Sequence, residues 1–257
     1  MICFKGRSLV KVTIKNKPIP EGLKIWAAAK KGYLLRWEYH IPEAAQTRER
    51  RRLIAARRHA DPHNLAETQR VMLNLAVSLP PAAYHIFFDN LFTTPSLIRA
   101  LRERGIAATG TAHTNHGIYH DFIIAKQANR EGQLQKWDFN KLQAVPSEDD
   151  LVNHIAFQDN CLVLWMTSYF SGSERVQHLR RRLNTMQAQA REARAFFSPD
   201  FGRVINTPCI QIAYNFNMNG VDRGDQLCAY RGYAHRIRRG GWQALAWTFL
   251  LDMILRP

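Results

Sequence analysis

The chain is short of cysteine, and its few cysteines form no metal-binding or disulfide framework. The 257 residues include four cysteines, no two of which make a Cys-x-x-Cys pair. This wide spacing is typical of a reducing compartment and argues against a structural zinc site built from this chain alone. The four are Cys3, Cys161, Cys209 and Cys228.

The chain also lacks a hydrophobic run long enough to cross a membrane. The longest such run, residues 242–255, is too short to span a bilayer and includes Asp252. Residues 1–5 lack the apolar segment of a secretory signal. We therefore expect no membrane partner.

Acidic residues are scarce, which makes the chain strongly basic. Asp and Glu number 21 against 36 Lys and Arg, giving a net charge of +15. Such an excess predicts an acidic partner, and nucleic acid is the first candidate. Because 46% of the residues are hydrophobic, the chain can bury a core and is not intrinsically disordered.

The hydrophobic pattern alternates between strand-like and helix-like segments and so predicts a mixed α/β fold. Residues 43–63 and 112–150 are polar and have no clear pattern. Thr94 is predicted to cap a helix with Pro95 at its first position. Strands are expected over 10–14, 24–29, 33–39, 84–88, 106–111, 151–157 and 162–167, and helices over 68–79, 95–104, 174–197 and 242–255.

Carboxylates at the ends of apolar runs stand out in so basic a chain. Asp89 closes the apolar segment 84–88, and Asp159 lies in a predicted hairpin turn. Asp222 and Asp225 share one helical face through their i, i+3 spacing. Clustered carboxylates without Cys or His partners suit Mg²⁺ or Mn²⁺, and a pair of such ions promotes phosphodiester cleavage.

Each of these acids also has a structural interpretation, which the sequence leaves open. Asp89 is compatible with a helix N-cap, although Thr94 already supplies one five residues later. Asp222 and Asp225 fit a first helical turn that the helix dipole favours. Asp159 fits an ordinary turn residue.

Basic residues occur in runs that fit either solvent-exposed faces or phosphate contacts. Runs at 48–58 and 180–182 are of this kind, whereas the arginines of 231–239 alternate with aromatic residues, as in proteins that bind nucleic-acid strands. Three histidines have zinc-like spacing but no further ligand, so we expect a solvated loop there and no zinc site. These are His113, His116 and His120. The predicted DNA-binding residues are Arg180, Arg181, Arg182, Arg231, Arg236, Arg238 and Arg239.

Several motifs, in their order along the chain, resemble those of piggyBac-type transposases. The most specific are Phe88-Asp89-Asn90 and the run Asn-Gly-Val-Asp-x-x-Asp-Gln at 219–226. Further similar segments extend the resemblance over nearly the whole chain. They are residues 4–8, 16–26, 91–94, 110–111, 159–160, 214–215 and 242–252.

The resemblance implies a ribonuclease-H-like catalytic core with a carboxylate triad and a divalent metal, Mg²⁺ or Mn²⁺. It implies cut-and-paste transposition of DNA at a TTAA target, in the nucleus, by a protein able to form a homodimer. By position, Asp89 is the first metal-holding acid, Asp159 a candidate second and Asp222 the third, with Asp225 beside it. In some relatives the second acid instead follows the strand equivalent to 162–167, where Glu174 is the next acid in this chain.

The resemblance also implies a domain plan. Residues 1–82 are expected to form an N-terminal flank for dimerisation and DNA binding, and 226–257 a C-terminal flank. Residues 83–172 with 207–225 are expected to form the core, interrupted by a helical insertion at 173–206. The chain is expected to be truncated at both ends relative to the family, without the cysteine-rich tail of many relatives.

Two other functions stay open at this point. One is a catalytically inactive, domesticated or decaying DNA-binding remnant of a transposase. The other is a generic ribonuclease-H-like nuclease, which would show no preference for TTAA.

Overall fold

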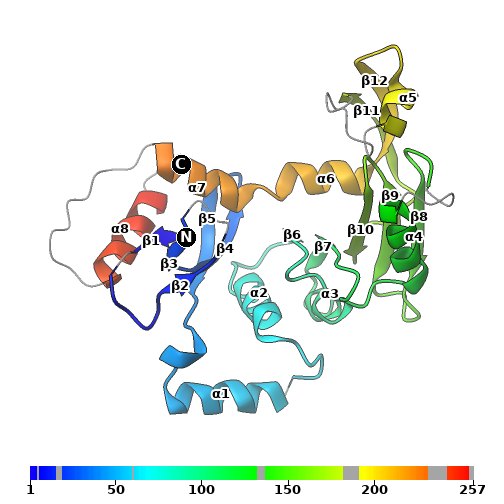
Figure 1. Cartoon of the computed structure of the whole chain (residues 1–257). Coiled ribbons are helices and arrows are strands. Elements are labelled where there is room, and N and C mark those ends of the chain that lie inside the picture. Colours follow the sequence, from blue (N-terminus) through cyan, green and yellow to red (C-terminus); the bar gives the residue numbers. More distant parts are fainter. Residues whose placement is uncertain are drawn as a thin grey trace. The chain divides into compact units, whose positions relative to one another are not determined.

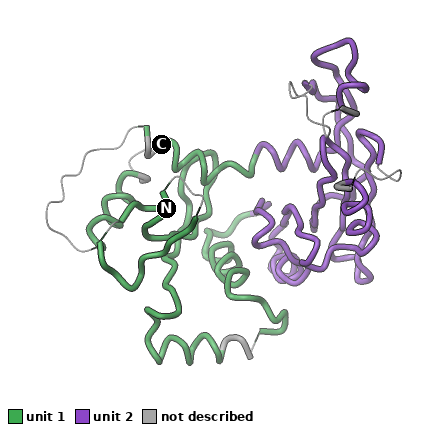
Figure 2. Tube along the Cα trace, viewed as in Figure 1, with its two compact units in different colours: residues 1–82, 217–257 green, residues 83–216 purple. Residues whose placement is uncertain are grey.

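Strands and helices alternate along the chain, and they group into two units (Figure 1). The computed structural model describes residues 1–4, 6–15, 19–59, 61–131, 137–181, 191–230 and 242–254. Unit 1 consists of residues 1–82 and 217–257, and unit 2 of residues 83–216 (Figure 2). Each unit is described by itself.

Unit 2 is built on a five-stranded sheet in the order β6-β7-β10-β9-β8. The first two strands pair in parallel, and all the other neighbours pair antiparallel. Strands β6, β7 and β9 therefore run in the same direction and end at the same edge. The bounds are β6 His85–Phe88, β7 Ala107–Thr111, β8 Leu142–Pro146, β9 Asn153–Gln158 and β10 Leu162–Thr167.

Helices cover this sheet and complete its core. Helix α3 (Pro95–Arg102) packs on β7 and β10, and α4 (His120–Glu131) packs on β10. Helix α6 (Cys209–Asn217) places Ile210 and Tyr214 against the buried side chains of Ile155, Phe157 and Trp165. A separate antiparallel pair, β11 (Arg175–Arg181) and β12 (Gly202–Pro208), is joined through α5 (Arg191–Phe197).

Within its described residues, unit 1 combines two small sheets with four helices and one 3₁₀ turn. Helix α8 packs Ala246 against Ile2 and Leu23, and Leu250 against Leu34, so it closes both sheets. The sheets are β1 (Ile2–Cys3), β3 (Glu21–Leu23) and β2 (Val12–Thr13) in that order, and the hairpin β4 (Ile25–Lys30) and β5 (Tyr33–Tyr39). The remaining elements are the 3₁₀ turn η1 (Glu43–Ala45), α1 (Arg48–His59), α2 (Glu67–Val77), α7 (Gly220–Tyr230) and α8 (Trp242–Ile254).

Most predicted elements are confirmed, because their hydrophobic faces are also the buried faces. The strands over 33–39 and 162–167 have the predicted bounds, and the strands predicted over 84–88, 106–111 and 151–157 differ by one or two residues at their ends. Thr94 caps α3 as predicted, since its Oγ1 accepts a hydrogen bond from the N–H of Leu97 at 3.3 Å. The predicted helices over 68–79 and 242–255 correspond to α2 and α8.

The predicted helix over 174–197 is wrong for its first part. Residues 175–181 form strand β11, and only 191–197 are helical among the described residues of that segment. Val176 and Leu179, which are three residues apart as on one face of a helix, are 45% and 54% exposed. The spacing i, i+3 misled the prediction, because the full backbone pairing with β12 stabilises an extended conformation there.

Residues 112–150, predicted to be without pattern, contain α4 and β8. Of the described side chains in α4, Phe122 and Ala128 are buried, while β8 is an edge strand with none of its side chains fully buried. A sparse apolar stripe and a half-exposed edge strand give little periodicity to detect.

The expected domain plan stays a prediction, although the contacts divide the chain at Ala83 and again between α6 and α7. None of the helices in the described part of the chain is both long and apolar enough to cross a membrane.

A glycine fixes the way β6 meets β7. Phe88 pairs with Gly110, and a Cβ added at Gly110 would lie 2.6 Å from the Phe88 ring and closer still to the Thr93 hydroxyl. Since Thr93 is fully buried, neither neighbour has room to move. The segment after β6 can thus pack closely against β7 because Gly110 has no side chain.

We predict that Gly110→Ala lowers the free energy of unfolding by about 1–3 kcal/mol through overpacking. Denaturant unfolding followed by near-ultraviolet circular dichroism would measure the change. In the control Gly202→Ala the nearest atom lies 3.5 Å away, so stability should change by less than about 0.5 kcal/mol. Equal effects of the two substitutions would contradict this account.

Candidate active site

Asp89 stands in a rigid turn at the carboxyl end of β6. Its Oδ1 accepts a hydrogen bond from the N–H of Leu91 at 2.9 Å, and its carbonyl accepts one from the Thr93 hydroxyl at 2.9 Å. The turn leads directly into α3, whose cap is Thr94. Asp89 is therefore not needed as the helix cap.

The Asp89 carboxylate keeps an open oxygen. The side chain is exposed, and no side chain among the described residues forms a hydrogen bond or an ion pair with it. An oxygen held in a fixed position without a donor is suited to binding a hard cation.

Helix α6 brings Tyr214 to the same end of β6. The Tyr214 hydroxyl lies 3.4 Å from the carbonyl oxygen of Phe88 and 3.3 Å from the hydroxyl of Thr111. Thr111 follows Gly110, the residue of β7 that pairs with Phe88. Burial raises the pKa of the Tyr214 phenol, and the negative charge of Asp89 raises it further, against an opposing hydrogen bond from Thr111. The phenol consequently stays protonated and fixes the carbonyl that precedes Asp89.

Asp159 is committed to other contacts. Both of its carboxylate oxygens accept hydrogen bonds from Nη2 of Arg180, at 2.7 and 2.8 Å, and Oδ2 also accepts one from Nε2 of Gln211 at 2.6 Å. The two charged side chains are only 15% and 18% exposed. These contacts favour a structural role for Asp159 and occupy Arg180, which we predicted to bind DNA.

The strand register also separates Asp159 from Asp89. Phe88, Gly110, Met166 and His154 lie in one row across the sheet. Asp159 therefore stands four residues further along than Asp89 and three strands away, roughly 13 Å along and roughly 14 Å across. The carboxyl groups of a shared metal site lie far closer than that.

The alternative second acid, Glu174, caps its own loop. Its carboxylate accepts hydrogen bonds from the N–H groups of Ser171 and Gly172, both at 2.9 Å. Partial burial acts to raise the pKa of Glu174, but these hydrogen bonds bring it below its ordinary value. Glu174 is thus an ionised loop-capping residue.

Asp222 and Asp225 both lie on helix α7, as their i, i+3 spacing predicts. This helix belongs to unit 1. Helix α7 starts against the hairpin, since a Cβ on Gly220 would lie 2.7 Å from the carbonyl oxygen of Ala29. Asp222 is exposed and has no hydrogen-bonding or charged partner in the described chain. Asp225 lies 3.6 Å from the amino group of Met1.

Within the described residues, no three His, Cys, Asp or Glu side chains lie close enough to hold a metal by themselves. The rings of His113 and His116 are in edge contact at 5.4 Å, and His120 begins α4. Among the described residues, Asp89 and Asp222 are the two predicted acids whose carboxylates have no side-chain partner, one in each unit.

Of the other six arginines predicted to bind DNA, the structure describes one. Arg181 is exposed on β11. Trp242, the first residue of α8 and just beyond the arginines of 231–239, packs edge-on against Tyr39 at 6.2 Å. Arg182, Arg231, Arg236, Arg238 and Arg239 lie outside the described residues.

Gln211 was not singled out from the sequence, and Tyr214 was named there only within the similar segment 214–215. Gln211 and Tyr214 are three positions apart on α6, and both are buried, so they form a polar stripe directed at the sheet. The sequence signal that would have indicated them is a glutamine and a tyrosine at i and i+3 in the otherwise apolar segment 209–214, shortly before the Asn-Gly-Val-Asp run.

A family model described as transposase IS4 matches residues 1–256. PiggyBac transposable element-derived protein 3 from Homo sapiens is 23% identical over 274 residues, covering 100% of this chain and 38% of the relative. The chimeric ERCC6-PGBD3 protein from Homo sapiens has the same identity over the same length, which is 21% of that relative. The chain thus spans well under half the length of the curated relatives it matches.

Among solved structures, a piggyBac transposase in a synaptic complex with hairpin DNA has a similar fold. The TM-score is 0.64 at 16% sequence identity, over 98% of this chain and 43% of that one. This likeness confirms the expected ribonuclease-H-like fold of mixed sheet and helices, and the three matches together confirm the piggyBac-type resemblance.

We predict that Asp159→Ala lowers the free energy of unfolding by about 2–3 kcal/mol, because Arg180 and Gln211 lose their shared acceptor. In a double-mutant cycle with Arg180→Ala, the coupling should exceed about 1 kcal/mol. Chemical denaturation of the four proteins would measure it. Asp200→Ala, at an exposed acid of the same unit, is the matched control and should change stability little. Additive effects at Asp159 and Arg180 would refute the structural role.

The surroundings of His85 on β6 predict that the fold loses stability in acid. Its Nε2 lies 2.8 Å from the Thr109 hydroxyl, and burial lowers the pKa of His85 to about 4. Between pH 6.5 and 4 the unfolded chain binds a proton that the native one does not, so stability falls as the pH decreases. After allowance for solvent screening, we expect His85→Phe to reduce the loss between pH 7 and 4.5 by about 1–2 kcal/mol. Unfolding at both pH values measures it, and an unchanged loss would contradict it.

Proposed function

Because this chain belongs to the transposase IS4 family, we propose that it forms a piggyBac-like catalytic core that cuts DNA strands and joins them to a target. The observation that supports this most directly is the Asp89 turn, where a carboxylate with an open oxygen is fixed at the end of a sheet strand. Asp222 is a second proposed metal-holding acid, as the resemblance to piggyBac-type transposases implies.

The residues present fit a hard divalent cation. Asp89 and Asp222 supply anionic oxygen ligands without competing cations among the described side chains, and Mg²⁺ and Mn²⁺ prefer such ligands. Asp225, one helical turn beyond Asp222, adds negative charge beside it. We do not carry Asp159 into this set, because Arg180 and Gln211 hold its oxygens.

Transposases of this family generally use divalent metal ions, which when bound activate the attacking oxygen and stabilise the leaving one. The protein's own part is to hold the ligands still. The N–H of Leu91 orients one Asp89 oxygen, and among the described residues the other oxygen has no hydrogen-bond donor. Tyr214 fixes the peptide just before Asp89, and its protonated phenol adds no charge to the site.

DNA is the proposed substrate, with transposon ends joined at TTAA. The net charge of +15 supports a polyanionic partner and predicts that affinity falls steeply with salt. Action on DNA implies a nuclear location, and a homodimer is proposed because two transposon ends must be handled together.

We predict that Asp89→Asn and Asp222→Asn each reduce Mg²⁺-dependent strand cleavage at least about 100-fold, while DNA affinity changes less than about threefold. Each substitution keeps the side-chain size but removes the charge that a cation needs. A fluorescent DNA duplex with a TTAA site and a nick would report both cleavage and binding.

Asp200→Asn is the matched control, since it removes an exposed carboxylate from unit 2 away from the β6 turn. Persistent cleavage in both active-site variants would refute the proposed site. DNA binding by the unaltered protein without metal-dependent cleavage would indicate the inactive remnant, and cleavage without regard to TTAA would indicate a generic nuclease.

A further inference from the structure

Helix α1 carries a dense positive charge and contributes little to the core. Its twelve residues include six arginines and one glutamate, so they hold five net positive charges. Among the side chains described, residues 48–56, only Ile54 is half-buried, and the rest are exposed. Stability of the fold therefore does not explain why this helix has its sequence.

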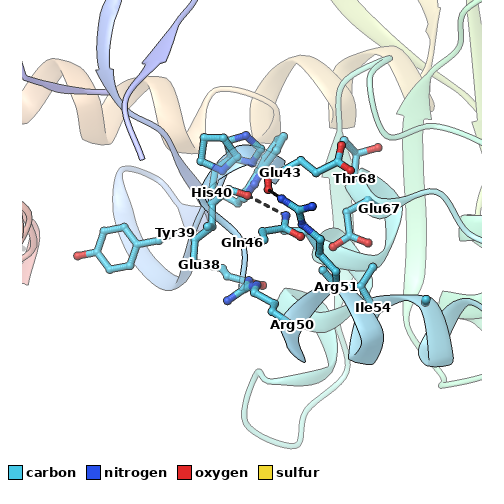
Figure 3. Close-up of a pocket in the computed structure, with 15 residues that line it drawn as sticks. Glu38, Tyr39, His40, Glu43, Gln46, Arg50, Arg51, Ile54, Glu67 and Thr68 are labelled. Carbon is cyan, nitrogen blue, oxygen red and sulfur yellow. Dashed lines mark hydrogen bonds and ion pairs between the residues drawn. The ribbon is translucent and has the colours of Figure 1, made fainter. Parts of the chain in front are cut away.

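The helix is nevertheless held in place within unit 1. The Thr47 hydroxyl caps its first turn by accepting from the N–H of Arg50 at 3.2 Å. Nη2 of Arg51 donates to the carbonyl oxygen of Glu43 at 2.8 Å, and Arg50 lies 4.0 Å from the Glu38 carboxylate. Figure 3 shows both arginines on the wall of a pocket of about 600 Å³. One side of the helix is thus attached to the unit.

Two arginines on another side have no such role. Arg48 and Arg52 are exposed, and neither forms a hydrogen bond or ion pair with a described residue. They are four residues apart, about 6 Å along the axis, and so lie one above the other on the helix surface. Like charges at this spacing repel, which means that an anion bound across both would stabilise the helix.

The pocket beneath the helix is a poor phosphate site. Glu38, Glu43 and Glu67 line it, and its two arginines already have partners. An anion is therefore favoured along the outer stripe of Arg48 and Arg52 rather than inside the pocket.

A membrane surface fits this helix less well than nucleic acid does. Helices that lie in a membrane interface bury a continuous apolar face. Here Leu53, 55% exposed, is the single large apolar side chain that the described part of α1 offers to solvent, while Ile54 faces the pocket. Guanidinium groups spaced along an exposed helix without such a face are matched to successive phosphates.

We propose that α1 binds the phosphate backbone of duplex DNA through Arg48 and Arg52, independently of base sequence. This contact lies outside the metal-holding acids, and it rests on the proposed function only in taking DNA as the polyanion. Unit 1 would thereby contact the DNA backbone itself. The sequence alone left open whether the arginines of this element face solvent or bind phosphate.

The test is the salt dependence of DNA affinity for Arg48→Gln/Arg52→Gln, measured by fluorescence anisotropy on a duplex lacking TTAA. Loss of two phosphate contacts should weaken binding about tenfold at low salt and reduce the slope of log K against log salt by about 2. Lys15→Gln/Lys30→Gln removes the same charge from exposed positions of unit 1 and is the matched control. The variant Arg48→Lys/Arg52→Lys should keep most of the slope.

The outcomes separate this inference from the proposed function. If the unaltered chain binds DNA but the glutamine variant and the lysine control behave alike, the α1 contact is refuted and the catalytic proposal stands. If the unaltered chain binds no DNA, the proposed function is refuted, and the α1 contact is refuted with it. Loss of binding to phosphatidylserine vesicles, with DNA affinity unchanged, would identify a membrane surface and overturn the inference.

Discussion

The close contact between β6 and β7 at Gly110 is the constraint on which the candidate site depends. Without a side chain there, the Phe88 ring and the Thr93 hydroxyl fill the space beside the strand. The chain then turns sharply, and the turn is closed by the Asp89 carboxylate and carbonyl. The Asp89 carboxylate becomes rigid in this way because the backbone around it is packed and hydrogen-bonded, and not because other described side chains hold it.

The few acidic residues of this basic chain divide into two groups by their surroundings. Asp159 neutralises Arg180 in a nearly buried pair, where loss of either partner would leave an uncompensated charge. Asp89 and Asp222 stay exposed and unpaired among the described residues. Asp89 is also fixed by its own turn, and a fixed carboxylate with an open oxygen is suited to the metal-holding role proposed for it.

Much of the fold could be predicted from the sequence, since a helix such as α2 buries the apolar positions that its period defines. The helix expected at 174–181 failed because its apolar residues are exposed, so periodicity carried no information about burial. The acid after β6 was found because an apolar strand ends on it. The role of Asp159 was not foreseeable, because its partners Arg180 and Gln211 are 21 and 52 residues away and come together only through the β11 pairing and α6.

The central proposal is that the fixed, open carboxylate of Asp89 at the end of β6 holds a divalent metal ion. The most direct measurement is an experimental structure of the protein soaked in Mn²⁺, with anomalous scattering to locate the ion. The account predicts an ion within coordination distance of an Asp89 carboxylate oxygen. An ion bound only at other residues would contradict it.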